Sequence, residues 1–286
     1  MGRQIIGVIG GSGLYQLAGL TEVRHVKVET PFGDPSDEYL MGELEGRTLV
    51  FLPRHGRGHR FSPSELNYRA NIHGFLQLGA RWVISVSAVG SMREEIRPGD
   101  MVIVDQFYDR TKGRQATFFG DGVVGHVPFA DPICPNLAEV VVKAAESVGA
   151  RFHRGGTYIC IEGPQFSTRA ESRIYRSWGV DVIGMTNVTE AKLAREAGLC
   201  YTTIAMATDY DCWHQDEEDV SVSSVLETLR HNVDTARQVI ARAALAVPAE
   251  RSCACADAPR HAVITDRGSL NAQTRRKLAL ILGEEE

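Results

Sequence analysis

The chain has 286 residues, of which 43% are hydrophobic, and a formal net charge of -5 at pH 7. This length and composition allow a large buried core, in one big domain or two ordinary ones. The charge balance, without a basic stripe, argues against nucleic acid as the main partner. No apolar run approaches the ~20 residues of a membrane span, and the N-terminus is typical of a first strand rather than a signal peptide. We therefore expect a cytoplasmic protein without membrane contact.

Continuous apolar runs alternate with helix-like segments through most of the chain. The helical segments cover 64–80 and 188–199, and each carries a glycine at its C-terminal end, where a helix cap belongs. Continuous apolar runs suit strands that are covered on both faces. Such strands are expected over 4–10, 47–53, 82–89, 100–107 and 201–208. This alternation predicts an α/β fold with a mostly parallel sheet.

The last quarter of the chain has a different pattern. Ser224 and Glu227 form a capping box, and apolar residues then step by three and four positions, which predicts one long helix ending near Pro248. A break rich in Ala, Cys and Pro follows, and a short helix-like piece lies near the end. We expect a single domain over 1–247 and a tail over 248–286, either packed on a neighbouring chain or frayed.

The six cysteines predict no metal site. Four of them are scattered through apolar or ordered-looking segments and are expected to be buried free thiols. These four are Cys134, Cys160, Cys200 and Cys212. Cys253 and Cys255 form a Cys-x-Cys in the tail, which is half a metal site at most, and no other His or Cys pair has metal-ligand spacing. A local disulfide or two free thiols are both expected there.

Polar side chains follow several of the predicted strands, where ligands bind in open α/β sheets. The glycine-rich turn at 10–13 is neither a dinucleotide fingerprint nor a P-loop, so it is either a tight turn or an anion nest. Each polar side chain alone is ordinary turn or cap chemistry. Hydroxyls with one guanidinium and one imidazole are together what a phosphate dianion needs. The set is Ser12, Arg54, His55, Ser87 and Thr186.

Two carboxylates, Asp209 and Asp211, directly follow the strand at 201–208. A buried, protonated Asp can donate to a ring nitrogen and accept from a neighbouring amino group, which adenine presents as N7 and N6. Such an acid could protonate a departing purine. A polar loop with a capping Asp is the alternative. Phe166 could stack on a base or belong to the core.

Six motifs carry a resemblance to a known family. GGSGLY, PRHGRGH, NYRAN, EGPQFSTRAES, GMTNVTEAKLAREAG and ATDYDCW, in this order over about 4–247, resemble the 5′-methylthioadenosine phosphorylases of the trimeric purine nucleoside phosphorylase type. The resemblance implies a three-layer α/β/α fold with a central mixed, mostly parallel sheet. It implies attack of inorganic phosphate on C1′ of methylthioadenosine, which releases adenine and 5-methylthioribose 1-phosphate in purine and methionine salvage. No cofactor is implied, since phosphate is a co-substrate.

The resemblance also implies roles for individual residues. The five strand-end residues would bind phosphate, Met185 the ribose, and Phe166 and Ser167 the purine. Asp209 would protonate N7 of the purine. Asp211 would support Asp209 and recognise the 6-amino group. The 5′ pocket would be lined by Val222, Val225 and Leu226, where relatives that prefer a 5′-hydroxyl carry a His near the first of these.

Assembly is implied as well. His126 matches a residue that family members contribute to the site of a neighbouring subunit. This implies a homo-oligomer, either a trimer or a dimer of trimers. In some relatives of the family a Cys-x-Cys like that of Cys253 and Cys255 forms a disulfide.

Two other functions remain open from the sequence. A 6-oxopurine phosphorylase, acting on methylthioinosine, inosine or guanosine, usually carries Asn where Asp209 stands. A non-catalytic nucleoside sensor is expected to lose Asp209 or Arg54, and both are present.

Overall fold

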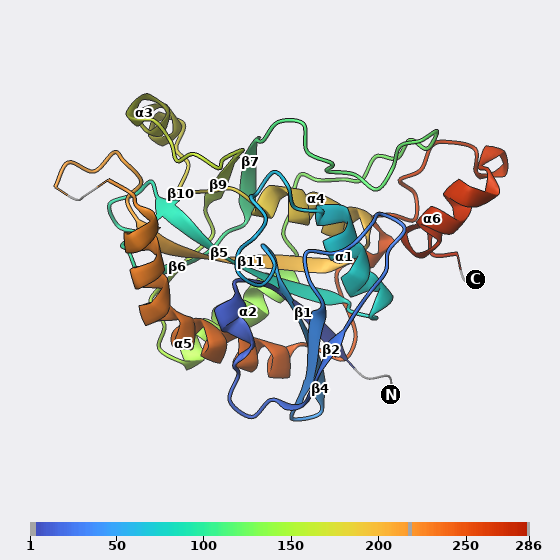
Figure 1. Cartoon of the computed structure of the whole chain (residues 1–286), viewed down its shortest axis with the longest axis horizontal. Helices are drawn as coiled ribbons and strands as arrows, with labels where there is room; N and C mark the ends of the chain where they lie inside the picture. The colour runs from blue at the N-terminus through green and yellow to red at the C-terminus, as the bar shows by residue number, and fades with distance from the viewer. Residues whose placement is uncertain (1–3, 217–218, 285–286) are drawn as a thin grey trace.

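One mixed sheet of eleven strands organises the computed structural model, which describes residues 4–216 and 219–284 (Figure 1). Its strands are β1 (Ile5–Gly10), β2 (Thr21–Val26), β3 (Tyr39–Leu44), β4 (Arg47–Pro53), β5 (Trp82–Ser91), β6 (Met101–Ile103), β7 (Gln106–Arg110), β8 (Phe152–Arg154), β9 (Thr157–Ile161), β10 (Val182–Gly184) and β11 (Cys200–Asp209). The main path runs β2-β3-β4-β1-β5-β10-β9-β7, while β11 pairs with β5 and β6, and β8 with β6. Six pairings are parallel and four antiparallel, which confirms a mixed, mostly parallel sheet.

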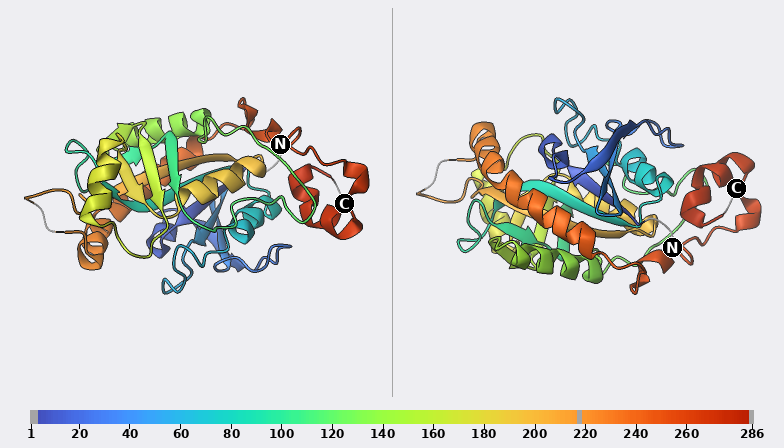
Figure 2. Two further views of the ribbon diagram at one scale, coloured as in Figure 1. Left: turned by 90° about the horizontal axis from the view of Figure 1, so that it is seen from above. Right: turned by 90° about the horizontal axis from the view of Figure 1, so that it is seen from below.

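Helices cover both faces of this sheet. They are α1 (Tyr68–Gln77), α2 (Pro135–Ser147), α3 (Arg169–Ser177), α4 (Asn187–Glu196), α5 (Val222–Ala246) and α6 (Ala272–Leu282). Helices α2 and α5 share one apolar cluster with one face of the sheet, and α1 and α4 share another with the opposite face (Figure 2). The expected three-layer α/β/α architecture is therefore confirmed. Within the described ranges, no helix has the combined length and apolarity needed to cross a bilayer.

Three local expectations were wrong. The single strand expected over 100–107 is two strands, because β6 joins β11 and β8 whereas β7 joins β9. Helix α1 begins at Tyr68 rather than near 64, since the Asn67 side chain accepts from Ala70 N and caps it there. The long helix begins three residues earlier than expected, because Ser221 rather than Ser224 is its N-cap.

The end of β5 positions the candidate site. Its first residues pair with β1, almost its whole length pairs with β11, and Gly90 and Ser91 pair with β10. A Cβ atom built on Gly90 would lie 2.9 Å from Ile183 Cγ2 and 3.0 Å from Asp209 Oδ1. Only a glycine therefore lets β10 and the end of β11 approach β5 this closely.

The tail packs on its own chain. Leu278, Ile281 and Leu282 of α6 are buried in the same cluster as Phe118 and Phe119, which lie on the loop 111–134. That loop runs along the upper edge of Figure 1 towards α6 and pairs with tail residues 262–264. The described part of the tail is thus folded against its own chain rather than frayed.

Candidate active site

Arg54 lies at the end of β4, and its guanidinium is completely buried against Glu190 of α4. Its Nε and Nη2 donate to the two Glu190 oxygens, Nη1 donates to Val86 O at 3.0 Å, and Nη2 also donates to Ser85 Oγ at 2.6 Å. Burial alone would lower the pKa of Arg54, but the charge and hydrogen bonds of Glu190 raise it. Arg54 is therefore a permanent cation, already paired, at the point where β1 and β4 end beside the middle of β5.

Glu190 is the centre of a buried polar network that the sequence analysis missed. Ser85 Oγ and Tyr201 Oη donate to its Oε2 at 2.8 and 3.0 Å. Asn187, the first residue of α4, donates to Ser85 Oγ at 2.9 Å and also to Thr203. Glu190 was interpreted only as part of a helix, because a first-turn acid is ordinary helix chemistry. The network joins α4 to three strands.

His55 is held as a neutral ring. Its Nδ1 lies 2.8 Å from Phe61 O, so that nitrogen carries the proton and Nε2 presents a lone pair. Burial, followed by the charge of Arg54, lowers the pKa of His55 to about 4. The ring stacks on His59 with centroids 4.1 Å apart. His55 is thus not the cation that the sequence allowed. Its Nε2 is suited to accept the remaining proton of a hydrogen phosphate.

Two of the three predicted phosphate hydroxyls lie within the described side chains. Ser87 Oγ is buried near the Tyr158 hydroxyl but has no partner of normal hydrogen-bond geometry among the described residues. Thr186 is the N-cap of α4, yet its hydroxyl donates to Asn187 Oδ1 at 3.1 Å rather than accepting from the helix backbone. The first N–H groups of α4 therefore have no side-chain cap, which suits an anion. The Ser12 side chain lies outside the described part.

Asp209 is the last residue of β11 and is buried. Its Oδ2 accepts from Thr208 Oγ1 at 2.7 Å, and its Oδ1 accepts from Asp211 N at 2.8 Å. Burial raises the pKa of Asp209 above its ordinary value, although both of these hydrogen bonds lower it in part. The protonated form is thus favoured relative to an exposed Asp, as a general acid requires.

Asp211 is buried beside Asp209, with a backbone φ of 54° that places the two carboxyl groups on one turn. Burial raises the pKa of Asp211 as well, and the nearby Ser172 and Ser167 hydroxyls offset part of this rise. A Cβ on Gly90 would lie 3.4 Å from Asp211 Cβ, so both acids stand at the end of β5. The structure thus brings together the two acids and Ser167.

Arg114 bridges the two segments that carry the predicted purine and ribose residues, and the sequence analysis missed it. It donates to Met185 O at 2.6 Å, to Glu162 O at 2.7 Å and to Tyr68 Oη at 3.0 Å. Its side chain is only 3% exposed. No motif signals this residue, because its partners lie far apart in the sequence. Phe166, which follows Glu162 on the segment before α3, is 42% exposed and so is not a core residue.

The three residues predicted for the 5′ pocket lie on the first turn of α5. Val222 and Leu226 are 66% and 47% exposed, and Val225 is half-buried. These residues are therefore not helix core, which was the ordinary expectation for apolar positions of an amphipathic helix. They form an uncovered apolar face shortly after Val220, whose N–H donates to Asp211 O at 3.1 Å.

His126 does not join the other site residues within this chain. It is exposed on the loop 111–134, and its N–H donates to Ala262 O in the tail at 2.8 Å. The loop leads away from β10 and α3 towards α6 (Figure 1). If His126 contacts a substrate, it does so in another subunit.

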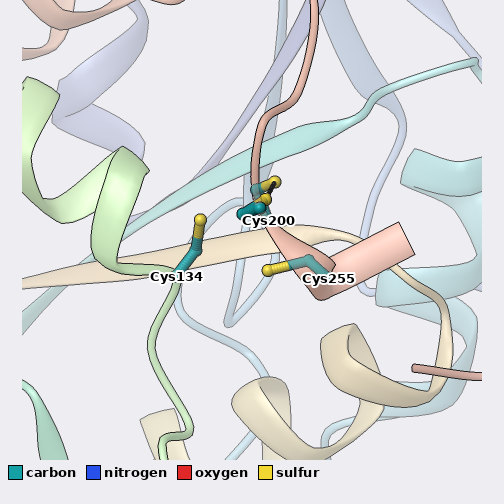
Figure 3. A group of neighbouring side chains, drawn as sticks. Cys134, Cys200 and Cys255 are labelled. Atoms are coloured by element: carbon teal, nitrogen blue, oxygen red, sulfur yellow. Dashed lines mark hydrogen bonds between the residues drawn. The ribbon is translucent and has the colours of Figure 1, made fainter. Parts of the chain in front are cut away.

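Cys253 and Cys255, expected to form a local disulfide or to be two free thiols, are free thiols that lie beside two further cysteines. The sulfur atoms of four cysteines, which we term the cysteine cluster, all lie within 4.8 Å of one another (Figure 3). Its members are Cys134, Cys200, Cys253 and Cys255. All six cysteines of the chain are described, and all are free thiols. Spacing along the sequence could not reveal a cluster built from three distant segments.

Known proteins resemble this chain over almost its whole length. Residues 5–245 match the family model described as "Phosphorylase superfamily". The S-methyl-5'-thioadenosine phosphorylase of Geobacter sulfurreducens is 59% identical, over 98% of this chain and 99% of the relative. The enzyme of the same name from Koribacter versatilis is 57% identical, over 98% and 96%.

Solved structures of similar proteins point to the same family. A methylthioadenosine phosphorylase sourced from an antarctic soil metagenomic library has a TM-score of 0.93 at 50% identity, covering 99% of this chain and 100% of the other. A mutant adenosine/methylthioadenosine phosphorylase of Schistosoma mansoni, solved in complex with methylthioadenosine, has a TM-score of 0.81 at 35% identity, covering 99% of both. The chain therefore belongs to the phosphorylase superfamily and, within it, to the methylthioadenosine phosphorylases.

Proposed function

We infer that this chain catalyses phosphorolysis of 5′-methylthioadenosine to adenine and 5-methylthioribose 1-phosphate, as a pentosyltransferase of purine and methionine salvage. The observation that carries this inference is the pair of buried acids, Asp209 and Asp211, at the end of β11 in a member of this family. A carboxyl group at 209 suits a 6-aminopurine, since it can donate to N7 and accept from N6.

Phosphate would bind where β1 and β4 end beside the middle of β5, below the ribose. The uncapped N-terminus of α4 and the Ser12, Ser87 and Thr186 hydroxyls supply donors to its oxygens. His55 Nε2 accepts the phosphate proton, and Arg54 adds a cation whose charge is largely neutralised by Glu190. Neutral donors dominate this arrangement, so the anion keeps much of its charge for attack on C1′.

The leaving purine would lie above the ribose, between Phe166 and the acids. As the bond to C1′ breaks, negative charge develops on the base, and Asp209 protonates N7. Asp211 donates its N–H to Asp209 and holds it in place, while Ser167 lies beside Asp211. Met185 faces the ribose.

An apolar 5′ pocket would select the methylthio group. Val222, Val225 and Leu226 offer no hydrogen-bond partner, and a buried 5′-hydroxyl without one costs about 1–3 kcal/mol. The exposure of this wall and of His126 supports an assembly in which a second subunit completes each site, with a trimer as the unit. The reaction needs no cofactor, because phosphate is a co-substrate. Residues 1–247 act as one catalytic domain. The enzyme works in the cytoplasm.

The experiment measures purine release from methylthioadenosine, with and without inorganic phosphate, alongside methylthioinosine, adenosine and inosine. We expect phosphate-dependent release of adenine, with kcat/KM highest for methylthioadenosine. Preference for methylthioinosine or inosine would overturn the assignment to a 6-aminopurine. Tight nucleoside binding without turnover would point to a sensor.

A further inference from the structure

We propose that the cysteine cluster binds one structural Zn²⁺ ion, which fastens the C-terminal tail to the body of the enzyme. The cluster lies apart from the candidate active site: Cys200 is the first residue of β11, whereas the acids stand at its last residue and beyond. Catalysis, as described above, does not use it.

The ligand set fits zinc. A tetrahedral ion bound to sulfur at about 2.3 Å places its ligands roughly 3.8 Å apart, and four thiolates with tetrahedral geometry are typical of zinc. The four sulfur atoms lie within 4.8 Å of one another, and those of Cys200 and Cys253 are 3.3 Å apart. Small movements of the side chains would therefore complete the tetrahedron.

The sulfur atoms converge from different directions. Cys134 precedes α2, Cys200 begins β11, and Cys255 lies in a short 3-10 helix of the tail over Ala254–Asp257. Figure 3 shows the labelled side chains of these three residues turned towards a common space between their segments. Thiols that merely fill a core have no reason to gather as four from three distant segments.

The surroundings can stabilise thiolates. Cys134 is the N-cap of α2, so its sulfur lies at the positive end of that helix. Arg251 lines a cavity of about 10 Å³ together with Cys134, Cys200 and Cys253, and it is held there by a 2.6 Å bond to Gly198 O. A zinc ion with four thiolates carries two net negative charges, which this arginine and the helix end partly balance.

Such an ion would tie together two segments that also touch elsewhere. Cys134 ends the loop 111–134, and Cys253 and Cys255 lie near the start of the tail. The same loop and tail pair at His126 and Ala262, and again through Lys277 and Asp121 at 2.9 Å. Because binding energy of a structural zinc becomes folding energy, the ion would hold the loop that carries His126 in position.

The test is the metal content of the full-length chain, produced in zinc-replete cells and purified under reducing conditions without a metal-affinity step. We expect about one zinc per chain by elemental analysis. A thiol-modifying mercurial should release this zinc, and a chelator-treated sample should unfold at a lower temperature and recover on addition of one equivalent of Zn²⁺.

Two variants make the assignment specific. Cys253→Ser with Cys255→Ser should lower the zinc content at least tenfold, whereas Cys160→Ala, which removes a buried thiol outside the cluster, should leave it unchanged. If the double variant does not fold, the release of zinc from the unaltered chain by the mercurial decides whether cysteine thiolates hold the ion. Less than about 0.1 zinc per chain, iron in its place, zinc that survives the double substitution, or a disulfide within the cluster by mass spectrometry would each overturn the proposal.

Discussion

Burial raises the pKa of Asp209, and two hydrogen bonds that favour its charged form lower this pKa; the effect of burial is the larger one. We predict that Asp209→Asn lowers kcat for methylthioadenosine roughly 10²–10⁴-fold, since the proton donor to N7 is lost. Asp234→Asn, an exposed change on α5, is the matched control and should leave kcat unchanged. Equal activity of the Asp209 variant and the unaltered enzyme would remove the general-acid role.

The same substitution has a signature in stability. Because the folded-state pKa of Asp209 is raised, its favourable contribution is complete below the ordinary Asp pKa and is lost as pH rises through the folded-state pKa. The Asn variant does not ionise, so its free energy of unfolding relative to the unaltered enzyme should rise between about pH 4, the ordinary Asp pKa, and pH 8. Thermal unfolding at both pH values measures this, and a relative loss of stability at pH 8 would contradict it.

At the scale of elements, the ion pair of Arg54 and Glu190 joins the end of β4 to α4. We predict that Glu190→Gln costs about 3–5 kcal/mol of stability, because it leaves Arg54 buried without a counter-charge. The KM for phosphate should also change, since Arg54 and the α4 N-terminus would both shift. Chemical unfolding and phosphate kinetics measure the two effects.

An exposed ion pair provides the control for this change. Glu29 pairs with Lys27 at 3.6 Å, and the two side chains are 82% and 71% exposed. Glu29→Gln should leave the unfolding midpoint close to that of the unaltered enzyme, because exposed pairs contribute little. If the Glu190 variant were no less stable than this control, the network would not be what holds α4 against the strand ends.

At the scale of the whole molecule, the tail is part of the folded body rather than an appendage. Ile281 of α6 is 2% exposed and its neighbour Leu280 is 47% exposed. We predict that Ile281→Ala costs about 2–5 kcal/mol of unfolding free energy, because it opens a cavity against the loop 111–134. Leu280→Ala should stay within about 0.5 kcal/mol. Equal effects in denaturant unfolding would mean that the tail is not packed as described.

Much of the site could be predicted at the level of residues. Continuous apolar runs mark the strands, and polar residues follow at their ends. Because the carboxyl ends of parallel strands meet at one edge of a sheet, the amino-acid order alone is enough to group Arg54, Ser87 and Asp209. Their partners could not be predicted in this way. Glu190 and Arg114 act through residues tens of positions away, and sequence periodicity reports only which face of an element is apolar.

Local chemistry in the sequence by itself determined the α/β class, the strand ends that carry polar side chains, and the order of six family motifs. Only the tertiary structure decided that Arg54 is already paired, that His55 is neutral, that the start of α5 is uncovered, and that four cysteines converge. The reason is physical: propensity and periodicity act over a few residues, whereas ion pairing, burial and metal-ligand geometry depend on how distant segments pack.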